Sequence, residues 1–166
     1  MKEAFDPKTL SAEAREAYES LLRTRFVEDS HVGYAGKVST NAIDFEMLLS
    51  ENQADAAFGS LFQEGSVEAR VYGLSGLFFT DREAFTNGIA ELKRAGGDVA
   101  RLTGCLAVSE PVADFVERSS NDVAIIEPEE SFEKILDSGR SFSLDVAHGG
   151  FPTMLVYYAR KEKEAK

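Results

Sequence analysis

The sequence is short of cysteine and of long apolar stretches. Its single cysteine, Cys105, excludes an intramolecular disulfide and is typical of a reducing compartment. No apolar run approaches the ~20 residues that a bilayer-spanning helix needs, and residues 1–19 lack the basic and then apolar pattern of a signal peptide. We therefore expect a cytoplasmic protein. The alternative is an exported protein whose signal peptide is missing from this sequence.

Basic residues are also scarce. The chain has 18 lysines and arginines against 29 aspartates and glutamates, which gives a net charge of −11. Because this excess of negative charge repels phosphate groups, it argues against nucleic acids and anionic membrane surfaces as partners. It permits a basic protein as a partner, although many proteins are acidic simply because charge aids solubility.

The common motifs of catalysis and ligand binding are missing. There is no H-E-x-x-H, C-x-x-C or calcium-loop pattern, no Walker loop and no G-x-G-x-x-G, so the sequence predicts no metal and no cofactor. Ser75 lies in the tetrapeptide GLSG, one position short of the G-x-S-x-G spacing of a nucleophile elbow, and in a predicted helix. We therefore reject Ser75 as a nucleophile.

The chain does have enough apolar material for a folded core. Hydrophobic residues make up 43% of its 166 residues, so we expect one folded domain, residues 1–166. The predicted class is α+β. An N-terminal helical bundle or layer of HEAT-like helix pairs is expected in residues 1–97, and short strands with a C-terminal β-hairpin in residues 98–160. We expect the charged tail, residues 161–166, to fray.

Two consecutive helices over residues 66–97 give the clearest structural signal. Ser66 is suited to cap the first helix, and Thr80 opens a capping-box pattern at the start of the second. Gly73 and Gly76 lie inside the first helix, where each costs ~1 kcal/mol relative to alanine. We infer that another helix crosses closely at these glycines, with no side chain between the two backbones.

Other segments are assigned from periodicity and from helix-breaking residues. Helices are expected over residues 11–26 with Ser11 as the N-cap, from Thr40 or Asn41, and from Asn52, so that four consecutive helices occupy residues 40–96. Residues 26–39 are expected to be a loop with at most a short strand. The remaining expected elements are strands over residues 101–108 and 123–126, helices from Ser109 and from Pro128, and a hairpin over residues 142–159.

One stretch carries a resemblance to known proteins. Tyr72–Leu77 follows the pattern Tyr-x-Leu-x-Gly-Leu, in a helix followed directly by a charged cap and a second helix. It resembles the helix-turn-helix units of HEAT-like repeat proteins, and also a group of small, poorly characterised bacterial helical proteins. The resemblance implies protein binding and brings no catalytic residues. No repeat with a period of about 33 to 45 residues recurs, which argues against a true solenoid.

Charge distribution provides the main functional hint. Residues 110–137 contain nine acids and two bases, which is −7 of the net charge of −11. We interpret this segment as a docking surface for a basic partner; the alternative is a solvated face, because charge runs usually mark exposure. The leading hypothesis is therefore a non-enzymatic protein-binding domain, such as an immunity or inhibitor protein. The proposed contact residues are Glu127, Glu129, Glu130, Glu133 and Asp137.

The competing hypothesis is a small enzyme or ligand-binding domain. Cys105 would be its nucleophile, with His31 or His148 as the base that a reactive thiol needs. A pocket near Tyr34, which is flanked by glycines, and His148 would be an alternative ligand site. Against this, Cys105 lies in an apolar run, and free cysteines are commonly buried as small hydrophobic residues. Tyr34 has an equally simple interpretation as a residue of a connecting loop.

Overall fold

The computed structural model describes residues 4–123, and in this part of the chain the predicted α+β class is confirmed. A short 3₁₀ helix, η1, precedes the first α-helix. In order, the helices are η1 Pro7–Thr9, α1 Ala12–Leu22, α2 Thr40–Leu49, α3 Ala54–Glu64, α4 Val67–Thr80, α5 Arg82–Ala95 and α6 Val112–Val123. Four consecutive helices, α2 to α5, therefore occupy the segment for which the sequence predicted them.

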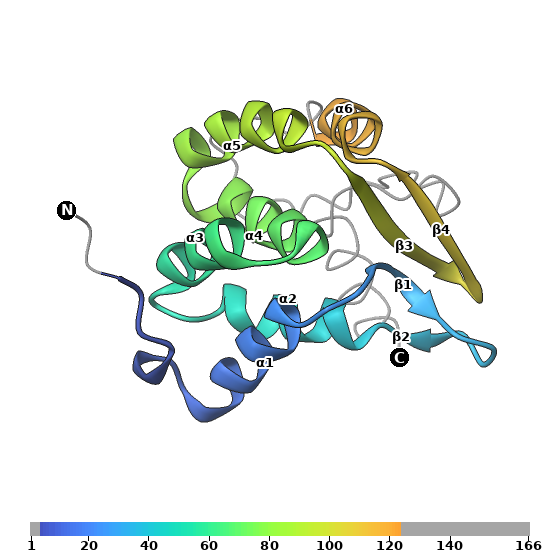
Figure 1. The fold of residues 1–166 in the computed structure, drawn as a ribbon. Helices are drawn as coiled ribbons and strands as arrows, with labels where there is room; N and C mark the ends of the chain where they lie inside the picture. Colours follow the sequence, from blue (N-terminus) through green and yellow to red (C-terminus); the bar gives the residue numbers. More distant parts are fainter. Residues whose placement is uncertain (1–3, 124–166) are drawn as a thin grey trace.

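The described strands form one mixed sheet at the end of the helical layer (Figure 1). The strands are β1 Val27–Val32, β2 Lys37–Val38, β3 Asp98–Gly104 and β4 Leu106–Pro111, in the spatial order β2-β1-β3-β4. β1 pairs in parallel with β3, whereas β2 and β4 pair antiparallel with their neighbours. The connection from β1 to β3 contains the whole α2–α5 region, so the sheet joins two distant parts of the chain.

The predicted close crossing at the α4 glycines is confirmed, and the crossing helix is α3. A Cβ on Gly73 would lie 2.5 Å from the backbone nitrogen of Phe62, and a Cβ on Gly76 would overlap the ring of Phe58. Phe58 is fully buried and packs against Phe45 with ring centroids 5.0 Å apart. The glycines thus allow α3 and α4 to approach until backbone meets backbone, which builds the centre of the core.

Two of the predicted helix caps are confirmed. The hydroxyl of Ser11 accepts a hydrogen bond from the Ala14 N–H at 3.3 Å, and that of Ser66 accepts one from the Ala69 N–H at 3.2 Å. Each bond satisfies a backbone N–H that has no partner within its helix. The first helix ends at Leu22, earlier than predicted.

The other predicted caps are wrong by one or two positions. Asp81, rather than Thr80, caps α5 and accepts from the Ala84 N–H at 3.0 Å. Ser39, rather than Thr40 or Asn41, caps α2. Helix α3 begins after Gln53 instead of Asn52, and Gln53 makes no side-chain capping bond. Neighbouring polar residues are all competent caps, so the choice depends on where the preceding segment ends.

The expected strand over residues 101–108 is also wrong, because the chain reverses within it. Gly104 has φ +56°, a conformation that favours glycine, and Cys105 lies between β3 and β4. The resulting β3–β4 hairpin spans residues 98–111. Residues 26–39 contain more strand than expected, since β1 and β2 form there. The predicted strand at 123–126, the helix from Pro128 and the hairpin at 142–159 lie beyond or at the edge of the described residues.

No helix within residues 4–123 combines the length and the apolar character that crossing a membrane requires.

Candidate functional site

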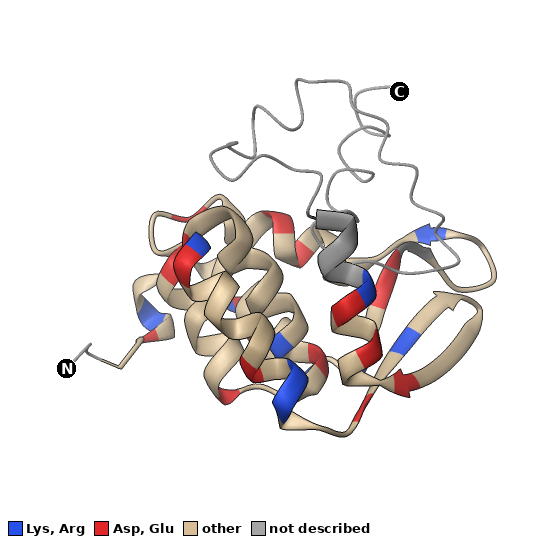
Figure 2. Ribbon diagram, turned by 90° about the horizontal axis from the view of Figure 1, so that it is seen from above, with Lys and Arg blue, Asp and Glu red and all other residues tan. Residues whose placement is uncertain are grey.

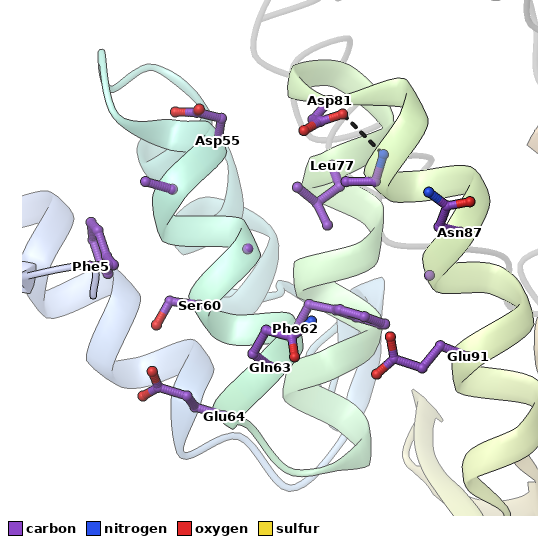
Figure 3. A pocket seen from close by; sticks show the side chains of 14 residues that line it. Phe5, Asp55, Ser60, Phe62, Gln63, Glu64, Leu77, Asp81, Asn87 and Glu91 are labelled. Atoms are coloured by element: carbon purple, nitrogen blue, oxygen red, sulfur yellow. Dashed lines mark hydrogen bonds between the residues drawn. The ribbon is translucent and has the colours of Figure 1, made fainter. Parts of the chain in front are cut away.

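A groove lies between α3 and α5 on the described surface. It has a volume of about 560 Å³ and is lined by residues of α3, α4 and α5 together with Phe5 of the N-terminal segment. Figure 3 shows α4 between the two flanking helices, with Asp55 and Asp81 at one end of the groove and Glu64 and Glu91 at the other. A volume of this size accommodates a small ligand or several side chains of a larger partner.

Part of the lining of the α3–α5 groove is apolar. Phe62 of α3 and Leu77 of α4 are 3% and 4% exposed, and Phe5 adds an aromatic ring that packs edge-on against Tyr18. Four other lining positions carry alanine or glycine, which leave the helix backbones close to the groove. These small residues are Ala56, Gly59, Ala84 and Gly88. The uncharged polar residues Ser60, Gln63 and Asn87 also line the groove, so an occupant meets apolar surface together with polar groups.

The rim of the groove carries only negative charge. Its lining includes four carboxylates, Asp55, Glu64, Asp81 and Glu91, and no lysine or arginine. Asp81 already caps α5, and Glu91 forms an ion pair with Arg70 at 3.0 Å. Among the described residues, no basic side chain pairs with Asp55 or Glu64. A partly apolar lining with an acidic rim is chemically suited to an amphipathic cation.

Arg70 supports the groove from outside. Its guanidinium lies 5.0 Å from the centre of the Phe62 ring, and its Nε donates to the Phe62 carbonyl at 3.0 Å. Arg70 therefore holds both Phe62 and Glu91 in place. It neutralises one of the four rim carboxylates only partly, because the side chain of Glu91 stays 49% exposed.

A second polar cluster lies where the sheet meets α6. Glu110 of β4 accepts two hydrogen bonds from Arg118 of α6, both at 2.7 Å, and its carboxylate lies 2.6 Å from Nε of Arg101 on β3. The hydrogen bonds from Arg118 lower the pKa of Glu110, and the charge of Arg101 lowers it further. This bidentate arrangement fixes α6 to the sheet, so we interpret it as structural.

Asp29 is the buried acid next to this cluster. It lies on β1 and is 4% exposed, and its Oδ2 has no hydrogen-bond partner among the described residues. Burial raises the pKa of Asp29 to about 6, although the neighbouring Thr103 hydroxyl and the Arg101 charge oppose the rise. Asp29 and Arg101 are thus two buried charged groups with incomplete hydrogen bonding. Of the two, Asp29 makes the stability of the fold sensitive to pH.

The acidic residues predicted to bind a partner are not placed by the structure. Glu127, Glu129, Glu130, Glu133 and Asp137 all lie outside the described residues. Within the described part of the same acidic segment, Glu110 is engaged with two arginines and Glu117 forms an ion pair with Lys93 at 3.4 Å. Figure 2 shows acidic positions on helices and strands alike, so the described negative charge is not confined to one element.

Cys105 does not have the buried position expected for it. It is exposed at the turn between β3 and β4, because the apolar run that contains it folds back on itself. The turn that carries Tyr34 lies at the same end of the sheet, where the Gly33 N–H donates to the Gly104 carbonyl at 2.9 Å. Tyr34 is fully exposed. His31 lies on β1 opposite Val38, and His148 lies outside the described residues.

Ser75 has a structural position. It is fully buried in α4, and its hydroxyl donates to the Val71 carbonyl at 2.7 Å. This is the bond that a serine inside a helix commonly forms with the preceding turn. Within residues 4–123, histidine, cysteine, aspartate and glutamate form no group of three or more that is able to hold a metal ion.

Comparison of the chain with protein-family models, with curated proteins and with solved structures gave no match. The α3–α5 groove was missed by the reasoning from sequence, because its walls come from three helices and the N-terminal segment. One signal for it was present: Gly59 lies in the middle of a predicted helix, where glycine is unfavourable.

Proposed function

We propose that this protein is a non-enzymatic protein-binding domain that docks on a basic partner. The observation that carries the proposal is the α3–α5 groove, whose lining combines apolar side chains with four carboxylates and includes no lysine or arginine. The net charge of −11 adds long-range attraction for a basic partner. The resemblance of Tyr72–Leu77 to HEAT-like helix pairs, which implies protein binding, agrees with this class. An immunity or inhibitor protein is the kind of acidic binding protein that the proposal favours.

The test is reversal of the two unpaired rim charges. Asp55→Lys and Glu64→Lys each have a matched control outside the groove. Glu13→Lys is also an exposed acid in a first helical turn, and Glu16→Lys is an exposed acid of α1. A partner captured from lysate of the native host at low salt should be released as salt rises. Its association with the double groove variant should be about tenfold slower and less dependent on salt, because rim charges act mainly on association.

The controls decide between the groove and net charge alone. If the pair Glu13→Lys and Glu16→Lys slows association as much as the groove pair does, the groove is not the docking site. The acidic segment outside the described residues is tested in the same way with Glu130→Lys and Glu133→Lys. An effect confined to that pair would assign docking to the predicted segment 127–137 instead of the groove.

The second candidate function is a small enzyme or ligand-binding domain that uses Cys105 with a histidine. The exposure of Cys105 beside the Tyr34 turn favours it. An activated thiol exists partly as thiolate at neutral pH, so it should react with iodoacetamide faster than a free cysteine does. Reaction at the rate of a simple exposed thiol, with unchanged binding by Cys105→Ala, would exclude this function.

A further inference from the structure

Gly59 is a helix glycine that packing within the described part of the chain does not explain. Glycine is a poor helix former, and three other helix glycines have a visible reason to be small. A Cβ on Gly73 or Gly76 would collide with α3, and a Cβ on Gly88 would lie 2.6 Å from Leu74. A Cβ on Gly59 would meet nothing within 4 Å, and its φ is an ordinary helical one.

The space next to Gly59 is the α3–α5 groove, whose lining includes this residue. Inside the fold, Gly73 shows what a helix glycine makes possible: because it has no side chain, the backbone of α3 approaches that of α4. A glycine that faces open space leaves the same close approach available to a segment from outside. A methyl group at this position would meet no atom of the fold within 4 Å, and it would make the groove shallower.

We propose that the α3–α5 groove receives one helix of a basic partner protein, which crosses α3 at Gly59. The inference rests on the proposed function and specifies which element of the partner binds. A helix fits better than an extended segment, because α3, α4 and α5 satisfy their own backbone hydrogen bonds and present no strand edge for pairing. The groove takes the apolar side chains on one face of the helix, and its rim takes the basic ones.

The rim charges fix the spacing of basic residues on the partner helix. Asp55 and Glu64 lie near opposite ends of α3, nine positions apart, which corresponds to about 14 Å at the helical rise of ~1.5 Å per residue. Asp81 and Glu91 mark the corresponding ends on the α5 side (Figure 3). The partner helix should therefore carry two basic residues nine positions apart, with small and apolar residues between them. Nine residues make about 2.5 turns, so the two basic side chains project from opposite sides of the helix, one toward the α3 side of the groove and the other toward the α5 side at its opposite end.

The experiment uses the full chain and a fluorescent synthetic peptide of about 20 residues, long enough to form a helix. The peptide carries a leucine and alanine stripe at helical spacing and lysines nine positions apart. A scrambled isomer of the same composition lacks the stripe. Gly59→Leu fills the groove, Gly59→Ala fills it with one methyl group, and Ala90→Leu adds the same side chain at an exposed position of α5 that does not line the groove.

We expect the striped peptide to bind at least tenfold more tightly than its isomer at moderate salt. Gly59→Leu should weaken this binding at least tenfold and Gly59→Ala about threefold, whereas Ala90→Leu should change it by less than twofold. Gly59→Ala should not lower the Tm, because a Cβ at this position meets no atom of the fold within 4 Å. The Tm of Gly59→Leu is measured beside it, so that binding is compared only between folded proteins. Equal binding of the two peptides, no binding of the striped peptide, or normal binding by a folded Gly59→Leu protein would each overturn the inference.

Two further outcomes separate this inference from the proposed function. In one outcome, the lysine variants of Asp55 and Glu64 lose a captured partner that Gly59→Leu retains. That result would support docking of a basic partner and refute the insertion of a helix at Gly59. A small cation is tested with 1,10-diaminodecane, whose two ammonium groups flank an apolar chain. Binding of this diamine that Gly59→Leu abolishes, without binding of the striped peptide, would replace the helix with a small amphipathic cation.

Discussion

Replacement of Asp29 by asparagine should change how the stability of the protein depends on pH. Asparagine keeps the size and polarity of the side chain but removes its charge. In the folded protein, burial raises the pKa of Asp29 from 3.8 to about 6. Well below pH 3.8 the carboxyl is protonated in both the folded and the unfolded chain, so it carries no penalty. Above pH 6 it is ionised in both, and the folded chain holds a buried charge.

The magnitude follows from the rise in pKa. A rise from 3.8 to about 6 corresponds to about 3 kcal/mol, which the wild-type protein loses as the pH rises from about 4 to above 6. Asp29→Asn does not lose this stability, because asparagine does not ionise. Its free energy of unfolding should therefore be close to that of the wild type near pH 4 and higher by up to about 3 kcal/mol above pH 7.

Other charged groups near Asp29 do not change the sign of this difference. Arg101 lowers the pKa of Asp29, and this attraction is already included in the value of about 6. Tyr72 keeps its proton throughout this range, because burial raises its pKa further. Glu110 has a lowered pKa, so its stabilisation is lost as the pH falls. Because that loss occurs in both proteins, it cancels in the difference.

The assay is urea unfolding of both proteins at several values between pH 4 and pH 8. Asp98→Asn, which removes an exposed carboxylate from β3 of the same sheet, provides the control. A constant difference between Asp29→Asn and the wild type across this range would refute the reasoning. So would a variant that is less stable than the wild type above pH 7.

Two further predictions concern helix packing and capping. Gly73→Ala should destabilise the protein by about 1–3 kcal/mol, because its Cβ would lie 2.5 Å from the Phe62 backbone nitrogen, whereas Gly59→Ala should stabilise it by about 0.5–1 kcal/mol. Urea unfolding measures both, and equal effects of the two substitutions would contradict the packing argument. Ser66→Ala should cost about 1 kcal/mol, because the Ala69 N–H loses its capping bond; an unchanged unfolding midpoint would show that water replaces the hydroxyl without cost.

The helical part of the fold was accessible from the sequence because its signals are local. Apolar spacing located α2 to α5, and the glycines of α4 predicted a close crossing before the crossing helix was known. The errors at Thr80 and Asp81 have the same local origin, since either residue is able to cap α5. The choice depends on the last turn of α4, where the Thr80 hydroxyl donates instead to the Gly76 carbonyl.

The sheet was harder to predict, because its pattern depends on distant partners. β1 contains the polar run Glu28-Asp29-Ser30, which does not alternate with apolar residues as a half-buried strand usually does. Asp29 is nevertheless buried, beside Arg101 from a strand that follows much later in the chain. The groove was hidden for a similar reason, since acids such as Asp55 and Glu64 are indistinguishable in sequence from ordinary solvated residues.

The parallel pairing of β1 with β3 sets the order in which the protein is completed during synthesis. Val27 is in register with Arg101, 74 residues later in the chain. At ~5–20 residues per second, a ribosome needs about 4–15 s to produce the residues between them. During this time the α2–α5 helices are able to form from contacts close in sequence, whereas β1 cannot pair until β3 has been synthesised. Closure of the sheet is therefore a late folding event, and it is the step most exposed to slow or interrupted translation.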